Sequence, residues 1–137
     1  MKTKELQYVT FEQAKKLKEI GFDYEVTHFY VKEDINKKLF AFWNHATMCI
    51  NSEKNYNHKD YKGYISSPTV ALALKWFRDE KNQIGYVSVR YAGNNTLKGF
   101  VGYINIGEIY VLADTYEAAE SALLDKLLDI LKKDNEK

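Results

Sequence analysis

The 137-residue chain has one proline, one cysteine and seven glycines. A single cysteine cannot form an intramolecular disulfide, which fits a reducing compartment. The polar N-terminal residues are not followed by the apolar stretch of a signal peptide, and no apolar run reaches the roughly 20 residues of a membrane-spanning helix. These absences predict a cytoplasmic protein that does not associate with a membrane.

A strong charge of either sign is also missing, because the formal net charge is +1. Domains that bind duplex nucleic acid are usually far more basic, since phosphate neutralisation supplies most of their affinity. Nucleic acid is therefore not an expected partner.

Common catalytic and cofactor motifs are absent: the sequence contains no G-x-S-x-G, no G-x-G-x-x-G and no Walker A loop. His45 and Cys49 have a helical spacing, but a zinc site needs three or four ligands, and only His28, His58 and the carboxylates remain to complete it. The neighbours of Cys49 are neutral and apolar, so nothing local activates it as a nucleophile. We expect no metal, no cofactor and no enzymatic activity; a site that pairs Cys49 with a distant histidine is the weaker alternative.

Aromatic side chains are abundant instead, with eleven tyrosines, seven phenylalanines and two tryptophans. The tyrosines are scattered through the strand-like stretches. Because each combines an apolar ring with a polar tip, tyrosine suits interfaces as well as cores.

Three segments have the apolar periodicity and the terminal signals of helices. Thr10 and Gln13 form a capping-box pattern at the start of the first helix. Ser67 as N-cap and Pro68 at the first helical position predict the start of the second helix, which should end near residues 81–82. Asp114 is the expected cap of the third helix. The expected core face of that helix carries Tyr116, Ala119, Leu123, Leu127 and Ile130.

Segments with a period of two predict five strands, at residues 24–32, 39–43, 84–91, 99–106 and 109–113. Residues 44–50 fit neither pattern, and residues 51–63 predict a long polar loop. The order α-β-β-α-β-β-β-α predicts an α+β fold in two layers, with an antiparallel sheet of about five strands and three helices mainly on one face. We expect a single globular domain over residues 1–137, with flexible ends at 1–8 and 133–137.

The sheet face away from the helices is the expected binding surface. Strand alternation places Tyr86 and Arg90 on this face, together with Tyr103 from the following strand. On the first strand His28 and Tyr30 are the expected outward pair. Such a platform can stack on a base, a peptide or another protein; at each single position, ordinary cross-strand packing on a solvated sheet is the alternative.

The sequence also resembles a known family, on residues 11–22 (FEQAKKLKEIGF), 67–78 (SPTVALALKWFR) and 115–119 (TYEAA). The family consists of small uncharacterised proteins carried by gut bacteria and their phages. The resemblance spans nearly the whole chain, and its most specific part is the second segment. Because the family has no assigned activity, the resemblance implies no functional residues. It implies a phage or mobile-element context, in which small proteins often bind a host component.

These observations predict a non-enzymatic protein-interaction module of phage or mobile-element origin that acts on a host component. It would bind a protein partner through the outward sheet face or through the loop at residues 51–63. The alternative is a small-ligand or nucleotide-binding protein that uses stacked tyrosines, with Arg90 or a lysine supplying charge.

Overall fold

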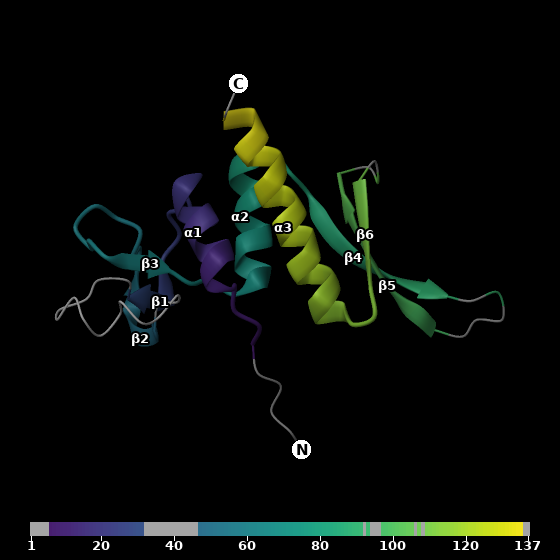
Figure 1. Ribbon diagram of the computed structural model, residues 1–137, viewed down its shortest axis with the longest axis horizontal. Coiled ribbons are helices and arrows are strands. Elements are labelled where there is room, and N and C mark those ends of the chain that lie inside the picture. Colours follow the sequence, from purple (N-terminus) through teal and green to yellow (C-terminus); the bar gives the residue numbers. More distant parts are fainter. Residues whose placement is uncertain are drawn as a thin grey trace, which may run out of the picture. The chain divides into compact units, whose positions relative to one another are not determined.

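The computed structural model describes residues 6–31, 47–91, 93, 97–105, 107 and 109–135 (Figure 1). The chain divides into two compact units, one formed by Tyr8–Thr69 and the other by Val70–Lys137 together with Met1–Gln7. Each unit contains one three-stranded antiparallel sheet. The α+β class with antiparallel pairing and three helices is therefore confirmed.

The single sheet of about five strands is wrong. The described elements follow the order α-β-β-β-α-β-β-β-α, and the six strands form two separate sheets. Every strand pair joins strands of the same half of the chain, so each sheet forms from strands that lie near one another in the sequence.

The first unit begins with helix α1 (Phe11–Glu19), whose start and end follow from local sequence. Thr10 and Gln13 form the predicted capping box: the Gln13 amide donates to Thr10 Oγ1 (3.1 Å) and the Thr10 amide donates to Gln13 Oε1 (2.9 Å). Gly21 has a φ of +98°, a conformation that glycine adopts without steric cost. The Phe22 amide then donates to the carbonyl five residues earlier (2.9 Å), which ends the helix in a Schellman motif and buries the Phe22 ring.

The sheet of this unit has the strand order β2-β1-β3, with β1 at Val26–Val31, β2 at Thr47–Lys54 and β3 at Tyr64–Ser66. The predicted strand at residues 39–43 lies outside the described residues. Residues 51–54 were predicted as loop but belong to β2; all four are exposed, so they show no alternation of apolar and polar side chains. The three residues of β3 are too few for a period to be recognised.

In the second unit, helix α2 (Val70–Lys81) ends where predicted but starts later than predicted. Ser67 and Pro68 are not its first residues. The Ser67 amide donates to the carbonyl of His28 (2.9 Å), and the Pro68 carbonyl accepts from the Val9 amide (3.0 Å). These long-range hydrogen bonds hold both residues in extended chain, so the helix begins at Val70.

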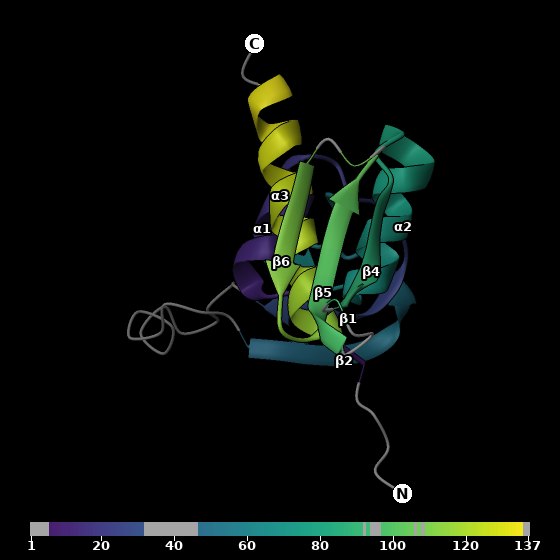
Figure 2. The ribbon, with the colours of Figure 1, turned by 90° about the vertical axis from the view of Figure 1, so that its right-hand side faces the viewer.

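Three strands follow as a meander with the order β4-β5-β6: β4 at Gly85–Tyr91, β5 at Leu97–Ile104 and β6 at Ile109–Ala113. Helix α3 (Tyr116–Asn135) packs against all three strands and lies on one side of the sheet in Figures 1 and 2. The predicted meander is confirmed, and so is the exact extent of its last strand.

The cap of α3 is Thr115 rather than Asp114. The Ala118 amide donates to Thr115 Oγ1 (3.1 Å), and the Ala119 amide donates to the Thr115 carbonyl (3.0 Å). The side chains of α3 that are fully buried are Ala119, Leu123, Leu124, Leu127 and Leu128. Tyr116, predicted to be in the core, is 45% exposed, although its ring meets the edge of Phe100 in β5 with 5.9 Å between the centroids.

Two glycines bring α3 close to the sheet. A Cβ at Gly102 would lie 2.9 Å from Val111 Cγ2 and 3.4 Å from Leu123 Cβ, and a Cβ at Gly85 would lie 3.0 Å from Leu123 Cδ2. The space that a side chain would take is filled by Leu123 instead. Glycine is therefore required at these positions by packing and not by backbone conformation.

We expect Leu127→Ala to lower the free energy of unfolding by about 2–5 kcal/mol, because the side chain is fully buried and its removal leaves a cavity. Chemical denaturation measures the loss. Lys126→Ala, at the exposed neighbouring position, is the matched control and should change stability by no more than about 0.5 kcal/mol. Similar losses from both variants would contradict the packing of α3 described above.

We expect Gly102→Ala to destabilise the protein by about 1–3 kcal/mol, because the new methyl group overlaps Val111 and forces α3 or β6 to shift. Gly93→Ala is the control, since a Cβ at Gly93 has no atom within 4 Å. Thermal and denaturant unfolding of the two variants should differ clearly. Equal stability of the two would show that the glycine at residue 102 is not a packing requirement.

Candidate functional site

Two of the predicted binding residues, Tyr86 and Tyr103, lie side by side on the face of the second sheet that points away from α3. Gly85 and Gly102 face α3, so alternation turns the next residue of each strand to the opposite side. Tyr86 and Tyr103 are register partners, with ring centroids 5.4 Å apart. Figure 2 looks onto this face, with α3 behind the strands.

The same face carries further residues that were not predicted. Tyr110 pairs with Tyr103, and Leu112 pairs with Val101, so a row of three tyrosines crosses the sheet beside a second row of Ser88, Val101 and Leu112. Tyr86, Tyr110 and Leu112 are 46%, 60% and 52% exposed, whereas Val101 is buried among its neighbours. Tyr110 could have been identified from the sequence. Residues 109–113 alternate as a strand, and pairing this strand with the preceding one places Tyr110 opposite Tyr103.

Arg90 lies on the same side of β4 as Tyr86, four residues further along the strand. Its side chain is half-buried. Its register partner is Gly99, which leaves the neighbouring position on β5 without a side chain. The six residues are here called the tyrosine face: Tyr86, Arg90, Val101, Tyr103, Tyr110 and Leu112. The face combines large exposed apolar groups, phenolic hydroxyls and one guanidinium.

His28 and Tyr30 belong to the other unit, and the prediction that they point away from its helix is wrong. The Tyr30 ring meets the edge of Phe11 in α1 (5.3 Å between centroids, 67°), and its hydroxyl donates to the Val9 carbonyl (2.9 Å). Burial raises the pKa of this phenol above its ordinary value. The His28 ring stacks on Tyr8 at 4.0 Å.

The opposite side of β1 carries Phe29, which is buried and is covered by aromatic rings from β3 and from the loop at residues 55–63. Phe29 stacks on Tyr56 at 4.2 Å and lies 5.0 Å from the ring of Tyr64. Tyr61 extends this cluster, 5.4 Å from Tyr56 and 6.1 Å from Tyr64. Both faces of β1 are therefore covered, which is why alternation alone did not identify the helix-facing side.

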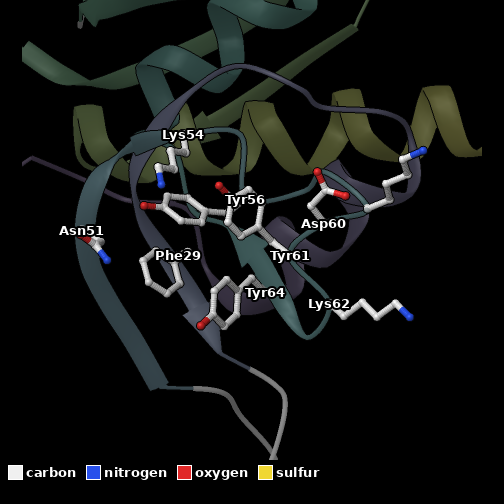
Figure 3. A pocket seen from close by; sticks show the side chains of 9 residues that line it. Phe29, Asn51, Lys54, Tyr56, Asp60, Tyr61, Lys62 and Tyr64 are labelled. Atoms are coloured by element: carbon white, nitrogen blue, oxygen red, sulfur yellow. The ribbon is translucent and has the colours of Figure 1, made fainter.

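These rings border a hollow of about 650 Å³ whose rim is polar (Figure 3). The hollow is here called the aromatic pocket, and its lining is Phe29, Asn51, Lys54, Tyr56, Lys59, Asp60, Tyr61, Lys62 and Tyr64. Its rim includes three lysines and one aspartate. The Lys54 ammonium lies 5.9 Å from the centroid of the Tyr61 ring, within reach of a cation–π contact.

The loop that forms the pocket is held by hydrogen bonds to α1, to β2 and to β3. Asn57 Nδ2 donates to the Phe22 carbonyl (2.9 Å), and Asn57 Oδ1 accepts from the Ser66 amide (2.9 Å). The Tyr56 hydroxyl donates to the Ser52 carbonyl, and Lys18 Nζ of α1 donates to the carbonyl of Tyr64 (3.0 Å). One asparagine thus joins the loop both to the end of α1 and to β3.

We expect Asn57→Ala to cost about 1–3 kcal/mol of stability, because it leaves the Phe22 carbonyl and the Ser66 amide without their partner. Amide hydrogen exchange should quicken at Ser66. Asn57→Asp retains the acceptor for Ser66 but loses the donor to Phe22, so its exchange at Ser66 should stay closer to wild type. Unchanged exchange at Ser66 in the alanine variant would contradict the anchoring role.

The described residues contain no group of three or more His, Cys, Asp or Glu side chains arranged to hold a metal ion. His58 Nδ1 lies 3.2 Å from a carboxylate oxygen of Asp60, and Cys49 is half-buried on β2 opposite Phe29.

Within the described part of the chain, none of the helices has the length and apolar character needed to span a bilayer. No family model matches the sequence, and no curated protein or solved structure matches it either.

Proposed function

We propose that this protein is a non-enzymatic interaction module that binds a partner protein through the tyrosine face. The observation that carries the proposal is the exposure of Tyr86, Tyr110 and Leu112 on one face of a sheet whose other face is packed against α3, with Tyr103 between the two exposed tyrosines. Single exposed apolar residues are normal on a protein surface, but a contiguous group of them marks an interaction site.

The residue types on this face are those that dominate protein interfaces. Tyrosine and arginine are enriched among the residues that contribute most to binding, because they combine a large contact area with hydrogen-bonding groups. The row Tyr86–Tyr103–Tyr110 crosses the three strands, so a partner can contact all three rings at once. Tyr103 is packed against Tyr86, which limits the freedom that its side chain would lose on binding.

The arrangement favours a partner with a flat, apolar surface and a carboxylate at its edge. The row of Ser88, Val101 and Leu112 lies between the tyrosine row and Arg90, so the guanidinium lies beyond the apolar groups of this face. A carboxylate there would form a charge-assisted hydrogen bond with Arg90. The resemblance to phage and gut-bacterial proteins supports a component of the host cell as the partner, and the single cysteine supports a cytoplasmic encounter.

We expect the double variant Tyr86→Ala/Tyr110→Ala to bind the partner at least about 30-fold more weakly, since truncating even one dominant interface tyrosine costs about 2 kcal/mol. Affinity capture from the source cells identifies the partner, and calorimetric titration of the purified pair gives the dissociation constant. Tyr116→Ala removes an exposed tyrosine of the same unit outside this face and is the matched control.

Circular dichroism and thermal unfolding establish that each variant is folded. An unchanged dissociation constant for the double variant, or an equal loss with Tyr116→Ala, would overturn the assignment of the face. Arg90→Glu should weaken binding at low salt, and substituting the opposing carboxylate of the partner by lysine should restore it. Failure of that restoration would contradict the proposed charge pairing.

A further inference from the structure

We propose that the aromatic pocket binds a small ligand that combines a flat heteroaromatic ring with a phosphate group, a nucleoside monophosphate being the simplest member of the class. The site lies in the unit formed by Tyr8–Thr69, whereas the tyrosine face belongs to the other unit. The two proposals therefore stand on different residues and can fail separately.

The first argument is the arrangement of the rings. Phe29 and Tyr56 are buried and stacked on each other, so they form a rigid apolar base. Tyr61 and Tyr64 are half-buried and nearly parallel, with an angle of 13° between their planes. Their rings line the hollow, and a flat ligand ring can stack against such surfaces whatever its substituents, because every nucleobase presents a π-face.

The second argument is the charge at the rim. Lys54, Lys59 and Lys62 border the hollow and are exposed, with Asp60 as the single acidic residue among the lining side chains. The whole chain has a formal net charge of only +1, so three lysines around one hollow are a local excess. Ammonium groups on flexible stems can follow a phosphate that extends from a stacked ring, and they attract an anion electrostatically.

The third argument is the order and size of the site. Asn57 joins the pocket loop to α1 and β3, and the Tyr56 hydroxyl joins it to β2. A ligand therefore meets a preformed surface and does not have to order a loop. The volume of about 650 Å³ lies within the range of about 300–1,000 Å³ that is usual for small-molecule sites.

Calorimetric titration with AMP, GMP, CMP and UMP tests the proposal, with adenosine, ribose 5-phosphate and inorganic phosphate as partial ligands. We expect saturable binding of at least one nucleotide, and binding at least about tenfold weaker for the nucleoside and for the sugar phosphate, since each lacks one of the two contacts. No saturable binding of any nucleotide at millimolar concentration would overturn the proposal. Equal affinity for ribose 5-phosphate would overturn the role of the rings.

Variants then locate the site. Lys59→Gln/Lys62→Gln should weaken nucleotide binding by about tenfold or more and flatten its salt dependence, with a smaller effect on the nucleoside. Tyr61→Leu keeps apolar volume but removes the ring, and should weaken both. The charge-matched control, Lys98→Gln/Lys132→Gln in the other unit, should bind as the wild type does. Loss in this control, or no loss in the pocket variants, would place binding elsewhere and overturn the assignment.

Two further measurements distinguish this proposal from binding at the tyrosine face and from recognition of a single-stranded nucleic acid. The Tyr86→Ala/Tyr110→Ala variant should retain nucleotide affinity, because its substitutions lie outside the pocket. A single-stranded oligonucleotide is the last probe. If it binds more than about tenfold tighter than the mononucleotide, the site recognises a polymer and the small-ligand proposal fails.

Discussion

The close contact between α3 and the second sheet determines which side of that sheet meets solvent. Leu123 occupies the space beside Gly85 and Gly102, where any other residue would place a side chain. Leu123 and Leu127, which lie nearest to Gly85, are both fully buried. Because strand residues alternate between faces, burial of the glycine side turns Tyr86, Tyr103 and Tyr110 to the opposite side. The exposed tyrosines are thus a consequence of the packing on the far face.

The sheet of the other unit does not leave one side of its central strand exposed, because both sides of β1 are covered. Tyr30 packs towards α1 on one side, and Phe29 packs against Tyr56 and Tyr64 on the other. The second cover is a loop, and a loop must satisfy its own backbone groups to stay folded over a sheet. The side chain of Asn57 meets part of that need for its neighbours. The aromatic pocket lies where this loop packs its rings against β1, and three lysines line it.

Much of the fold could be predicted from local sequence. The capping box of Thr10 and Gln13, the end of α2, the strand at residues 109–113 and the leucines of α3 each depend on neighbours within one or two turns. The predictions that were wrong concern features that depend on contacts between residues far apart in the sequence. Ser67 and Pro68 have the local signature of a helix start, but hydrogen bonds to β1 and to Val9 keep them extended. The separation into two sheets likewise depends on which strands pair, and no local pattern encodes that choice.

One candidate site could be predicted in part from local sequence, and the other could not. Tyr86 and Tyr103 could be placed together because one alternating strand follows another through a short turn, so that their register is nearly determined. The aromatic pocket could not be predicted, because its rings come from β1, from β3 and from a segment without periodicity. Residues 51–54 look like loop for a physical reason: an exposed strand of polar residues has no buried side to create alternation. That both sides of β1 are covered could not be inferred from the sequence of this strand.

The hydroxyl groups suggest a physical distinction among the many tyrosines. The hydroxyls of Tyr30 and Tyr56 donate to backbone carbonyls of their own unit, so the polar tips of these rings are satisfied within the fold. Tyr86 and Tyr110 instead combine a large exposed fraction with a position on a regular strand that pairs with β5. Their rings are not needed to close a core. A tyrosine excess of this kind divides into rings that hold the fold and rings that the fold exposes to solvent.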